Sequence, residues 1–402
     1  MAEVKTDSIK IKGQAILHGN VYLSGDPLSS IFYICFALFN EQKARIKNVP
    51  RCKLFLDFLS SIERLGISVN WEDESVITVD GTGELRENLV SLFDGSEYGF
   101  AQVLIPILLR RNRECEVHPE LRTEVKFYRE LGVLVKVNYN ILNLKLPLDA
   151  NFDIRKNFNL IHADPYLIAS RLFTSYLFNN LSVEYDKHDA RFNFYNEIII
   201  NEKASDFVEY KVSFSQPEFN LYASIASFSN GEVSLNNFDL SESLNFLLSI
   251  DSIGFRYEVM QNAIKIWYVG FDENAIIDWS SHSFNSIAHL ILLLAKTTRK
   301  TTKIITVSYP NINSLITDLN IMGCRIEAKE GKKGYSLITI KPPSAFSSVK
   351  NDVSDLDVGS AVLAFACFYS GNSRISGFEV ISEYMPYLID NLKSLNIDIS
   401  KK

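Results

Sequence analysis

Small and polar residues precede two helix-like runs, at positions where the chain could bind an anion. The stretch SGDPLSS contributes Asp26, Ser29 and Ser30, and the turn FDGSEYGFAQ contributes Gly99. Backbone N–H groups at the start of a helix lack partners and carry the positive end of the helix dipole, so they can surround a phosphate or a carboxylate. At the first stretch the alternative is a plain N-cap by Asp26, with Pro27 at the first helical position.

Basic side chains occur in a pattern that could face an anionic ligand. Arg122, Lys126 and Arg129 follow i, i+4, i+7 spacing in HPELRTEVKFYRELG, which places them on one face of a predicted helix. The alternative is a solvated face, because three glutamates are interleaved with them: Glu120, Glu124 and Glu130. Arg171 lies in the apolar run PYLIASRLFTSYLF, where it either contacts a ligand or extends its charged end to the surface.

Histidines and cysteines indicate no metal site. His289 opens an apolar helix-like run, where a hydrogen-bonded structural histidine is expected rather than a base. The 5 cysteines are odd in number and lack metal-ligand spacing, so we expect buried, unpaired thiols. The chain contains no Ser-His-Asp pattern, no phosphate-loop lysine motif and no HExxH helix.

The elements that would position these residues recur along the chain. A unit of apolar helix, polar turn and short strand occurs six times, with these representative strand residues: Ile46, Val117, Val183, Val233, Ile305 and Ile375. By subtraction the intervals are 71, 66, 50, 72 and 70 residues, so the third unit is shortened. In five units a second helix ends at a Leu-Gly-like stop, with Asn396 in the last copy, and an alternating strand follows. A left-handed C-cap residue explains each stop.

Composition limits the class of protein. The chain has 402 residues, 47% of them hydrophobic and 22% charged, as is ordinary for soluble domains. The net charge of −7 gives no nucleic-acid footprint, and no apolar run reaches the ~20 residues of a membrane span. The first residues lack a signal-peptide core, so we expect a cytoplasmic protein, and we expect a monomer.

Six β/α units in two sets of three resemble the plan of the enolpyruvyl transferases. The opening IKGQAILHGNVYLSGDPLSS, the helix-like NVPRCKLFLDFLSSIERLG and the closing SGFEVISEYMPYLIDNLKSLNIDI look similar to EPSP synthase (3-phosphoshikimate 1-carboxyvinyltransferase). The resemblance implies an α/β (α+β) fold of two domains, each of three βαβαββ-type repeats. We expect one domain to comprise residues 1–22 with 217–402, the other residues 23–216, and a ligand-binding cleft to lie between them.

The resemblance also implies a reaction. That family transfers the carboxyvinyl group of phosphoenolpyruvate to shikimate 3-phosphate, in aromatic amino-acid biosynthesis, without a metal or other cofactor. The ligand would be a small molecule in the cleft, with no nucleic acid or membrane involved. Two phosphorylated anions would lie side by side, so the site should be rich in Arg and Lys.

The chain departs from the family pattern at most of those positions. The opening Lys-Ser-x-x-x-Arg falls on Pro27, Leu28 and Phe32, and the late Lys falls on Glu383. The acid and base positions fall near Ser286, next to Asn285, and near Ser308. The residues that these placements and the patterns above assign to the cleft are Asp26, Ser29, Ser30, Gly99, Arg122, Lys126, Arg171, Asn311 and Glu383.

Two hypotheses follow from this conflict. In the first, the chain is an EPSP-synthase-like enzyme that uses other cations, such as Arg122, Lys126 or Arg171. In the second, it is a degenerate family member that binds a less anionic ligand or a protein partner. The second is favoured on mechanism, because losing one partner of a charge-assisted hydrogen bond costs ~1.5–3 kcal/mol. Five or six such losses exceed the roughly 8 kcal/mol of a micromolar complex.

Overall fold

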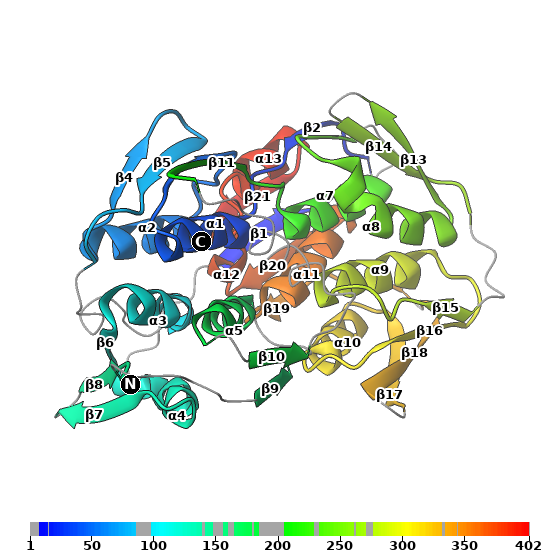
Figure 1. Cartoon of the computed structure of the whole chain (residues 1–402). Coiled ribbons are helices and arrows are strands. Elements are labelled where there is room, and N and C mark those ends of the chain that lie inside the picture. Colours follow the sequence, from blue (N-terminus) through cyan, green and yellow to red (C-terminus); the bar gives the residue numbers. More distant parts are fainter. Residues whose placement is uncertain are drawn as a thin grey trace. The chain divides into compact units, whose positions relative to one another are not determined.

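The chain forms two compact units in the computed structural model (Figure 1). Unit 1 comprises Met1–Asp26 and Ser213–Lys402, and unit 2 comprises Pro27–Val212. The boundaries thus follow residues 26 and 212, where the expected ones follow residues 22 and 216. The structure describes residues 8–14, 16–85, 98–138, 141–147, 156–159, 165–178, 181–184, 205–228, 233–260, 263–270, 276–331, 334–343 and 345–401.

The described part of unit 1 contains three four-stranded sheets. The first has the order β19 (Lys350–Asp352), β20 (Asn372–Ser376), β1 (Ser8–Lys12) and β21 (Asp398–Lys401). The second has the order β13 (Phe255–Met260), β14 (Ala263–Tyr268), β12 (Val233–Asn236) and β2 (Gly19–Tyr22). The third has the order β15 (Ile276–Asp278), β16 (Thr302–Val307), β18 (Tyr335–Lys341) and β17 (Arg325–Glu330).

The described part of unit 2 contains a four-, a three- and a two-stranded sheet. The largest has the order β11 (Phe207–Lys211), β3 (Lys43–Lys47), β5 (Val76–Asp80) and β4 (Ser68–Trp71). The next has the order β6 (Glu114–Val117), β8 (Ile141–Lys145) and β7 (Leu134–Asn138), and the last pairs β9 (Lys156–Asn159) with β10 (Leu181–Glu184).

The pairing within the sheets shows that the chain is built from repeats. Each four-stranded sheet has one parallel pair followed by two antiparallel neighbours, as in β15–β16–β18–β17 and β11–β3–β5–β4. Among the described residues, the third repeat contributes only the parallel pair β9–β10. All six representative strand residues lie in the predicted strands: β3, β6, β10, β12, β16 and β20. The predicted α/β fold of repeats with a shortened third copy is confirmed.

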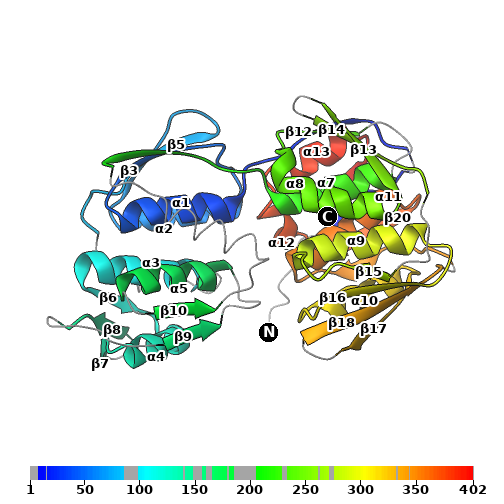
Figure 2. The same ribbon diagram turned by 45° about the vertical axis from the view of Figure 1, so that its right-hand side comes forward.

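Each repeat contributes a central helix that lies inside its unit. Those of unit 2 are α1 (Pro27–Phe39), α3 (Tyr98–Asn112) and α5 (Pro165–Leu177). Those of unit 1 are α7 (Gln216–Phe228), α9 (Phe284–Thr297) and α11 (Leu356–Phe368), with the sheets around them (Figure 2). A helix that is apolar on all sides is typical of such a buried position, and eleven of the thirteen residues in α11 are buried.

In the described residues, outer helices follow five of the six central ones, and in each of these five repeats a residue in the left-handed region follows the last outer helix. The outer helices are α2 (Lys53–Arg64), η2 (Pro119–Leu121) with α4 (Arg122–Glu130), α8 (Leu240–Ser252), α10 (Ile312–Ile321), α12 (Glu379–Ser382) and α13 (Leu388–Ser394). The five predicted C-cap positions have these φ angles: Gly66 99°, Gly132 85°, Gly254 90°, Gly323 97° and Asn396 62°. A positive φ is costly for residues other than glycine and asparagine, so this part of the prediction is confirmed.

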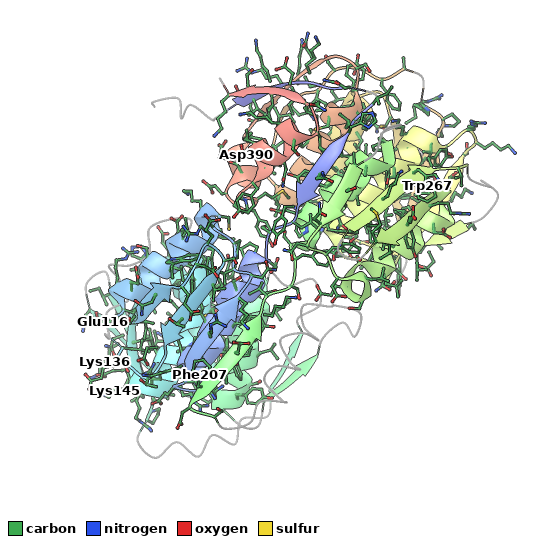
Figure 3. The ribbon with its side chains drawn as sticks, turned by 90° about the horizontal axis from the view of Figure 1, so that it is seen from above. Glu116, Lys136, Lys145, Phe207, Trp267 and Asp390 are labelled. Atoms are coloured by element: carbon green, nitrogen blue, oxygen red, sulfur yellow. The ribbon has the colours of Figure 1, made fainter. Side chains whose placement is uncertain are left out.

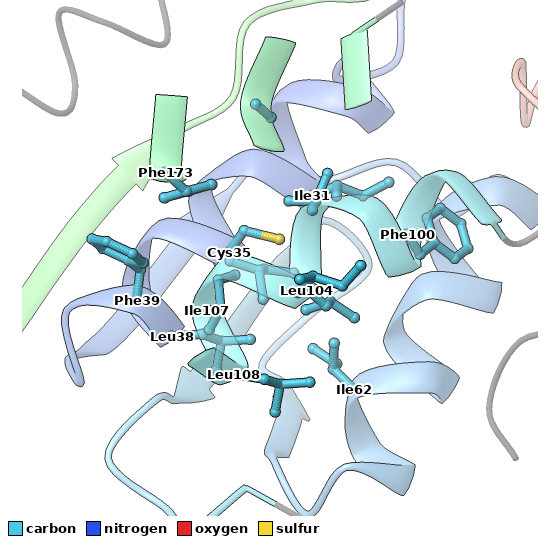
Figure 4. Close-up of a cluster of buried hydrophobic side chains, with 14 of the residues drawn as sticks. Ile31, Cys35, Leu38, Phe39, Ile62, Phe100, Leu104, Ile107, Leu108 and Phe173 are labelled. Carbon is cyan, nitrogen blue, oxygen red and sulfur yellow. The ribbon is translucent and has the colours of Figure 1, made fainter. Parts of the chain in front are cut away.

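Unit 2 has a core of aliphatic and aromatic side chains between its central helices. Ile31, Cys35, Leu104 and Phe173 point into this cluster (Figure 4). The five cysteines are all buried and free, as predicted. Charged side chains such as Lys136 and Lys145 lie at the surface of the unit (Figure 3).

Membrane-spanning helices and clustered metal ligands are both absent from the described ranges. Every helix there is too short or too polar to cross a lipid bilayer. Those ranges also hold no group of three or more His, Cys, Asp or Glu side chains arranged for a metal ion.

Candidate functional site

The three central helices of unit 1 carry a ladder of polar side chains where they face one another. Gln216, Asn220 and Ser224 are four residues apart on α7, so they lie on one face of that helix. Asn220 contacts Asn285 of α9, and Ser224 contacts His289 one turn later. Because the partners advance in the same order on both helices, α7 and α9 run in the same direction.

Asn285 is the centre of this ladder. Its Oδ1 accepts a hydrogen bond from Asn220 Nδ2 at 2.7 Å, and its Nδ2 donates to Asp357 Oδ1 of α11 at 2.8 Å. Asn220 Nδ2 also donates to Ser286 Oγ at 3.1 Å, and Asn220 Oδ1 accepts from Gln216 Nε2 at 2.9 Å. An amide has two donors and one oxygen acceptor, so these bonds occupy much of the capacity of both asparagines.

His289 is bound on both ring nitrogens. Nδ1 lies 3.0 Å from Ser224 Oγ, and Nε2 lies 3.0 Å from Ser360 Oγ of α11. Its side chain is buried, and burial lowers its pKa to about 3. The imidazole is therefore neutral at ordinary pH and too weakly basic for general base catalysis. The prediction of a structural histidine is confirmed.

The N-terminal ends of these helices are capped by the chain itself. Asp355 Oδ1 accepts from the backbone N–H groups of Asp357 and Val358, both at 2.9 Å, at the start of α11. Ser283 Oγ accepts from Ser286 N at the start of α9, and Ser215 Oγ accepts from the third residue of α7, both at 3.4 Å. At each of these helix ends, one or two of the backbone N–H groups that could attract an external anion are thus bound by side chains of the protein, one of which is a carboxylate.

A second polar cluster lies at the start of α7. Glu218 is fully buried, and its carboxylate accepts from Ser24 N at 2.7 Å and from Ser24 Oγ at 2.8 Å. Burial raises the pKa of Glu218 to about 7, and the charge of Asp26 acts in the same direction, while the bonds from Ser24 oppose the rise. Tyr384 Oη donates to Asp26 Oδ1 at 2.7 Å. These contacts hold the segment that leads into α1.

Sequence comparison associates the chain with carboxyvinyl transferases. Residues 2–100 match the family model of EPSP synthase (3-phosphoshikimate 1-carboxyvinyltransferase). The curated UDP-N-acetylglucosamine 1-carboxyvinyltransferase from Halothermothrix orenii is 20% identical over 424 residues, which cover 97% of this chain and 98% of that protein.

Solved structures extend this likeness to the whole chain. The enolpyruvyl transferase NikO from Streptomyces tendae superposes with a TM-score of 0.77 at 14% identity, covering 99% of both chains. The chain has the enolpyruvyl transferase fold. EPSP synthase from Acinetobacter baumannii gives a TM-score of 0.69 at 13% identity, covering 98% of this chain and 100% of that one. The fold implied by the repeat plan is therefore confirmed, and so is the resemblance of the N-terminal stretches to EPSP synthase.

The acid and base positions named from the resemblance lie in unit 1. Ser286 belongs to the polar ladder, and Ser308 Oγ lies 2.7 Å from Ser336 Oγ on the neighbouring strand. Asn311, predicted to line the cleft, donates from Nδ2 to Asp355 Oδ2 at 2.9 Å. Ser286 and Asn311 thus both contact groups at the N-terminal ends of the central helices, whereas Ser308 pairs elsewhere.

Arg171 does not extend to the surface, so this expectation is wrong. Its guanidinium is buried and donates to both carboxylate oxygens of Glu124, at 2.7 and 3.0 Å. It also lies 3.4 Å from the ring centroid of Phe127. A buried arginine needs a carboxylate that matches its fork, and α4 supplies one. Glu124 therefore pairs with α5, not within its own helix.

The other basic residues of α4 do not form a shared site. Lys126 and Arg129 are exposed, which agrees with the solvated-face alternative for these two. The side chain of Arg122 lies outside the described residues. Of the other two predicted cations, Lys126 is exposed and Arg171 is buried against Glu124, so these two do not converge on one point.

Gly99 has a packing role in unit 2. A Cβ atom at this position would lie 2.6 Å from a ring carbon of Tyr166, so only glycine allows α3 to approach α5 this closely. Ser29 and Ser30 lie within α1, where Pro27 is the first helical residue as predicted. Ser30 is fully buried and Ser29 half-buried.

Glu383 and Asp26 are brought to one region of unit 1. Glu383 follows α12 as its C-cap residue, and the adjacent Tyr384 provides the hydroxyl that binds Asp26. Both acidic residues are half-buried. The resemblance would place one lysine at Glu383 and another at Pro27, next to Asp26, so this region carries acidic side chains where basic ones are expected.

Sequence reasoning missed Asn220, Ser224, Asp357, Ser360 and Glu218. A signal did exist for α7, because QPEFNLYAS places three polar residues four apart in an otherwise apolar helix. Such a stripe in a buried helix predicts polar partners on a neighbour. It does not identify those partners, since Asn220 and Asn285 are 65 residues apart.

Proposed function

We propose that this chain is a degenerate enolpyruvyl transferase that does not transfer a carboxyvinyl group to shikimate 3-phosphate. In place of two phosphorylated substrates it would bind a less anionic small molecule, through amide, hydroxyl and carboxylate groups. The observation that carries the proposal is the capping of three helix N-termini in unit 1 by side chains of the protein: Ser215, Ser283 and Asp355.

Electrostatics supports the loss of anion binding. Two like charges 5 Å apart repel by about 3 kcal/mol at an effective dielectric constant of 20. Asp355 and Asp357 lie at the start of α11, and Asp26 and Glu383 stand near positions where the resemblance calls for lysine. A phosphate brought to either region would therefore face carboxylates.

The contacts of Arg171 argue against the enzyme alternative, which needs this arginine to bind a substrate anion. Arg171 is engaged on both forks by Glu124 and is buried, so recruiting it for a substrate would leave Glu124 as an unpaired buried charge. Such a loss typically costs ~3–5 kcal/mol. Lys126 remains exposed, but a single solvated lysine is a weak substitute for a set of bidentate arginines.

A turnover assay tests the proposal. Phosphate release should be measured with phosphoenolpyruvate and shikimate 3-phosphate, and in parallel with UDP-N-acetylglucosamine as acceptor. We expect no release above the blank with either. Release at an ordinary enzymatic rate, roughly 1 s⁻¹ or faster, would contradict the proposal.

A binding measurement separates loss of chemistry from loss of substrate binding. Small-angle scattering and thermal denaturation should be recorded with both substrates at millimolar concentration. We expect the radius of gyration and the Tm to stay unchanged. The matched control is Lys126→Ala, whose radius of gyration and Tm should also stay unchanged when the substrates are added. If the substrates made the unaltered chain more compact and Lys126→Ala abolished this effect, the enzyme alternative would be favoured again.

A further inference from the structure

The outer helix α8 of unit 1 carries three leucines on its exposed side. Leu240, Leu244 and Leu248 are 41%, 40% and 54% exposed, and their spacing of four residues places them in one stripe along the helix. The opposite side of α8, with Phe246 and Ile250, is buried, and the helix contacts β13, α7 and α9 (Figure 1). The leucine stripe is therefore surplus to the core of unit 1.

The leucine stripe distinguishes α8 from the outer helix α2. Of the seven exposed residues of α8, three are the leucines of the stripe, and Glu242 alone is charged. Helix α2 instead exposes Lys53, Glu63 and Arg64, as is typical of the outer side of an amphipathic helix. Large apolar side chains that are grouped on a surface indicate contact with another molecule.

The spacing of the stripe is the same from either end, with Leu244 at its centre. A twofold axis at Leu244 would set this residue against its own copy and Leu240 against Leu248, so the same surface serves both partners. The stripe is also a single i±4 ridge, the kind that packs beside a like ridge in the commonest class of helix pair. A second copy of the chain thus presents a surface that fits the stripe.

The charges at the two ends of α8 favour an antiparallel pair over a parallel one. Its N-terminal end carries Asp239 and Glu242. Its C-terminal end is followed by Arg256, whose Nη1 lies 2.8 Å from Asp251 Oδ1. A parallel pair would place the two acidic ends side by side, whereas an antiparallel pair places each acidic end near the arginine of the other copy.

We propose that the chain self-associates through α8, with the α8 of a second copy docked antiparallel on the leucine stripe. A stable interface buries about 800 Å² on each partner, which is more than three half-exposed leucines supply. The dimer is therefore weak, and the expected monomer is the form at low protein concentration. This surface is separate from the ligand site of the proposed function and does not depend on it.

Introduced cysteines test the pairing, because the five native cysteines are all buried and free. Leu244→Cys, oxidised at high protein concentration, should give a disulfide-linked dimer on a non-reducing gel. The matched control is Leu56→Cys, since Leu56 is 42% exposed on α2 of unit 2. We expect about tenfold more dimer from Leu244→Cys, because docking holds its two thiols together. Equal yields from the two variants would overturn the proposal.

A mixture of two variants tests the direction of the helices. Antiparallel pairing predicts that Leu240→Cys and Leu248→Cys form a disulfide with each other and that neither links efficiently to itself. At equal total concentration, each variant alone should give several-fold less dimer than the mixture. As much dimer from either variant alone would contradict the antiparallel arrangement.

Sedimentation at rising protein concentration tests self-association without a crosslink. The unaltered chain should change from monomer to dimer, and Leu244→Asp should weaken the dimer about a hundredfold, because it sets two like charges across the axis. Leu56→Asp should leave the dimer unchanged, and circular dichroism checks that both variants stay folded. An unaltered chain that stays monomeric at the highest concentration would refute the proposal, and so would a dimer that a folded Leu244→Asp variant retains.

Discussion

The central helices of the two units have the same place in the repeat but different side chains between them. In unit 2, Phe32 of α1 lies on Phe173 of α5, with ring centroids 5.4 Å apart, and Cys35 is the most polar group of the cluster in Figure 4. In unit 1, the facing positions hold Asn285 and His289, each hydrogen-bonded to both neighbouring helices. One architecture is therefore filled with an apolar core in one unit and with a polar ladder in the other.

Apolar packing and hydrogen-bonded packing differ in how strictly they fix the register between neighbouring helices. Apolar contacts are stabilising in many registers, because they depend on buried area and not on direction. Hydrogen bonds between buried groups are satisfied in one register only, and a shift by one turn would leave Asn285 and Asp357 without partners. We interpret the ladder as the feature that sets where the three helix N-termini of unit 1 end.

Truncating the aromatic contact in unit 2 should have the largest effect. Phe173 contacts three rings of α1, including Phe39 at 5.0 Å. Phe173→Ala should destabilise unit 2 by about 3–5 kcal/mol, because it removes buried area and leaves a cavity. Urea unfolding followed by amide exchange of α5 measures this. Phe173→Leu is the control and should cost less than half as much; a loss below 1 kcal/mol for the alanine would show that the cluster repacks.

Breaking the ladder in unit 1 should cost somewhat less, by a different mechanism. Asn285→Leu keeps the volume but removes a donor to Asp357 and an acceptor for Asn220, so we expect a loss of about 2–4 kcal/mol. The double variant with Asn220→Leu should cost less than the sum of the single variants by about 0.5–3 kcal/mol. Strict additivity in urea unfolding would show that the two amides are not coupled.

The stability of the two units should also depend differently on pH, because unit 1 buries His289 and Glu218, whose pKa values shift on folding. The pKa of His289 is lowered from 6.5 to about 3, so between these values the unfolded chain binds more protons and stability rises with pH. The pKa of Glu218 is raised from 4.5 to about 7, so between these values the folded chain binds more protons and stability falls with pH. From pH 4.5 to 6.5 the two contributions oppose each other.

Single variants should reveal each contribution. Relative to the unaltered chain, Glu218→Gln should gain stability by about 1.4 kcal/mol per pH unit from pH 4.5 to 6.5, and His289→Gln should lose it at the same rate. The total is about 2–3 kcal/mol across that window, read as the difference in urea unfolding at three pH values. Cys35 of unit 2 supplies the control, because burial raises the pKa of its thiol and Cys35→Ala should show no slope there. Parallel curves for all variants would refute the opposing titrations.

Local features of this fold could be predicted from sequence, and long-range pairings could not. Gly66 and Asn396 were identifiable because a left-handed C-cap demands a particular residue type at a particular place. The partner of Arg171 was not, because Glu124 lies 47 residues away on another helix, and no local rule links them. The two roles that sequence offered for Arg171, a ligand contact or an extension to the surface, both left out a matching buried carboxylate.

The smallest effect on stability should come from replacing one sulfur by oxygen in unit 2 and one oxygen by sulfur in unit 1. Cys35→Ser replaces sulfur by oxygen in the apolar cluster, and Ser224→Cys does the reverse beside His289. Each should cost about 1 kcal/mol. The new hydroxyl can donate only to a carbonyl of its own helix, while the thiol is a weaker partner for the imidazole. Urea unfolding of both variants measures the pair. If Cys35→Ser left the free energy of unfolding unchanged while Ser224→Cys lowered it, the core of unit 2 would accept a polar atom. The stability of the fold would then not require that core to be apolar.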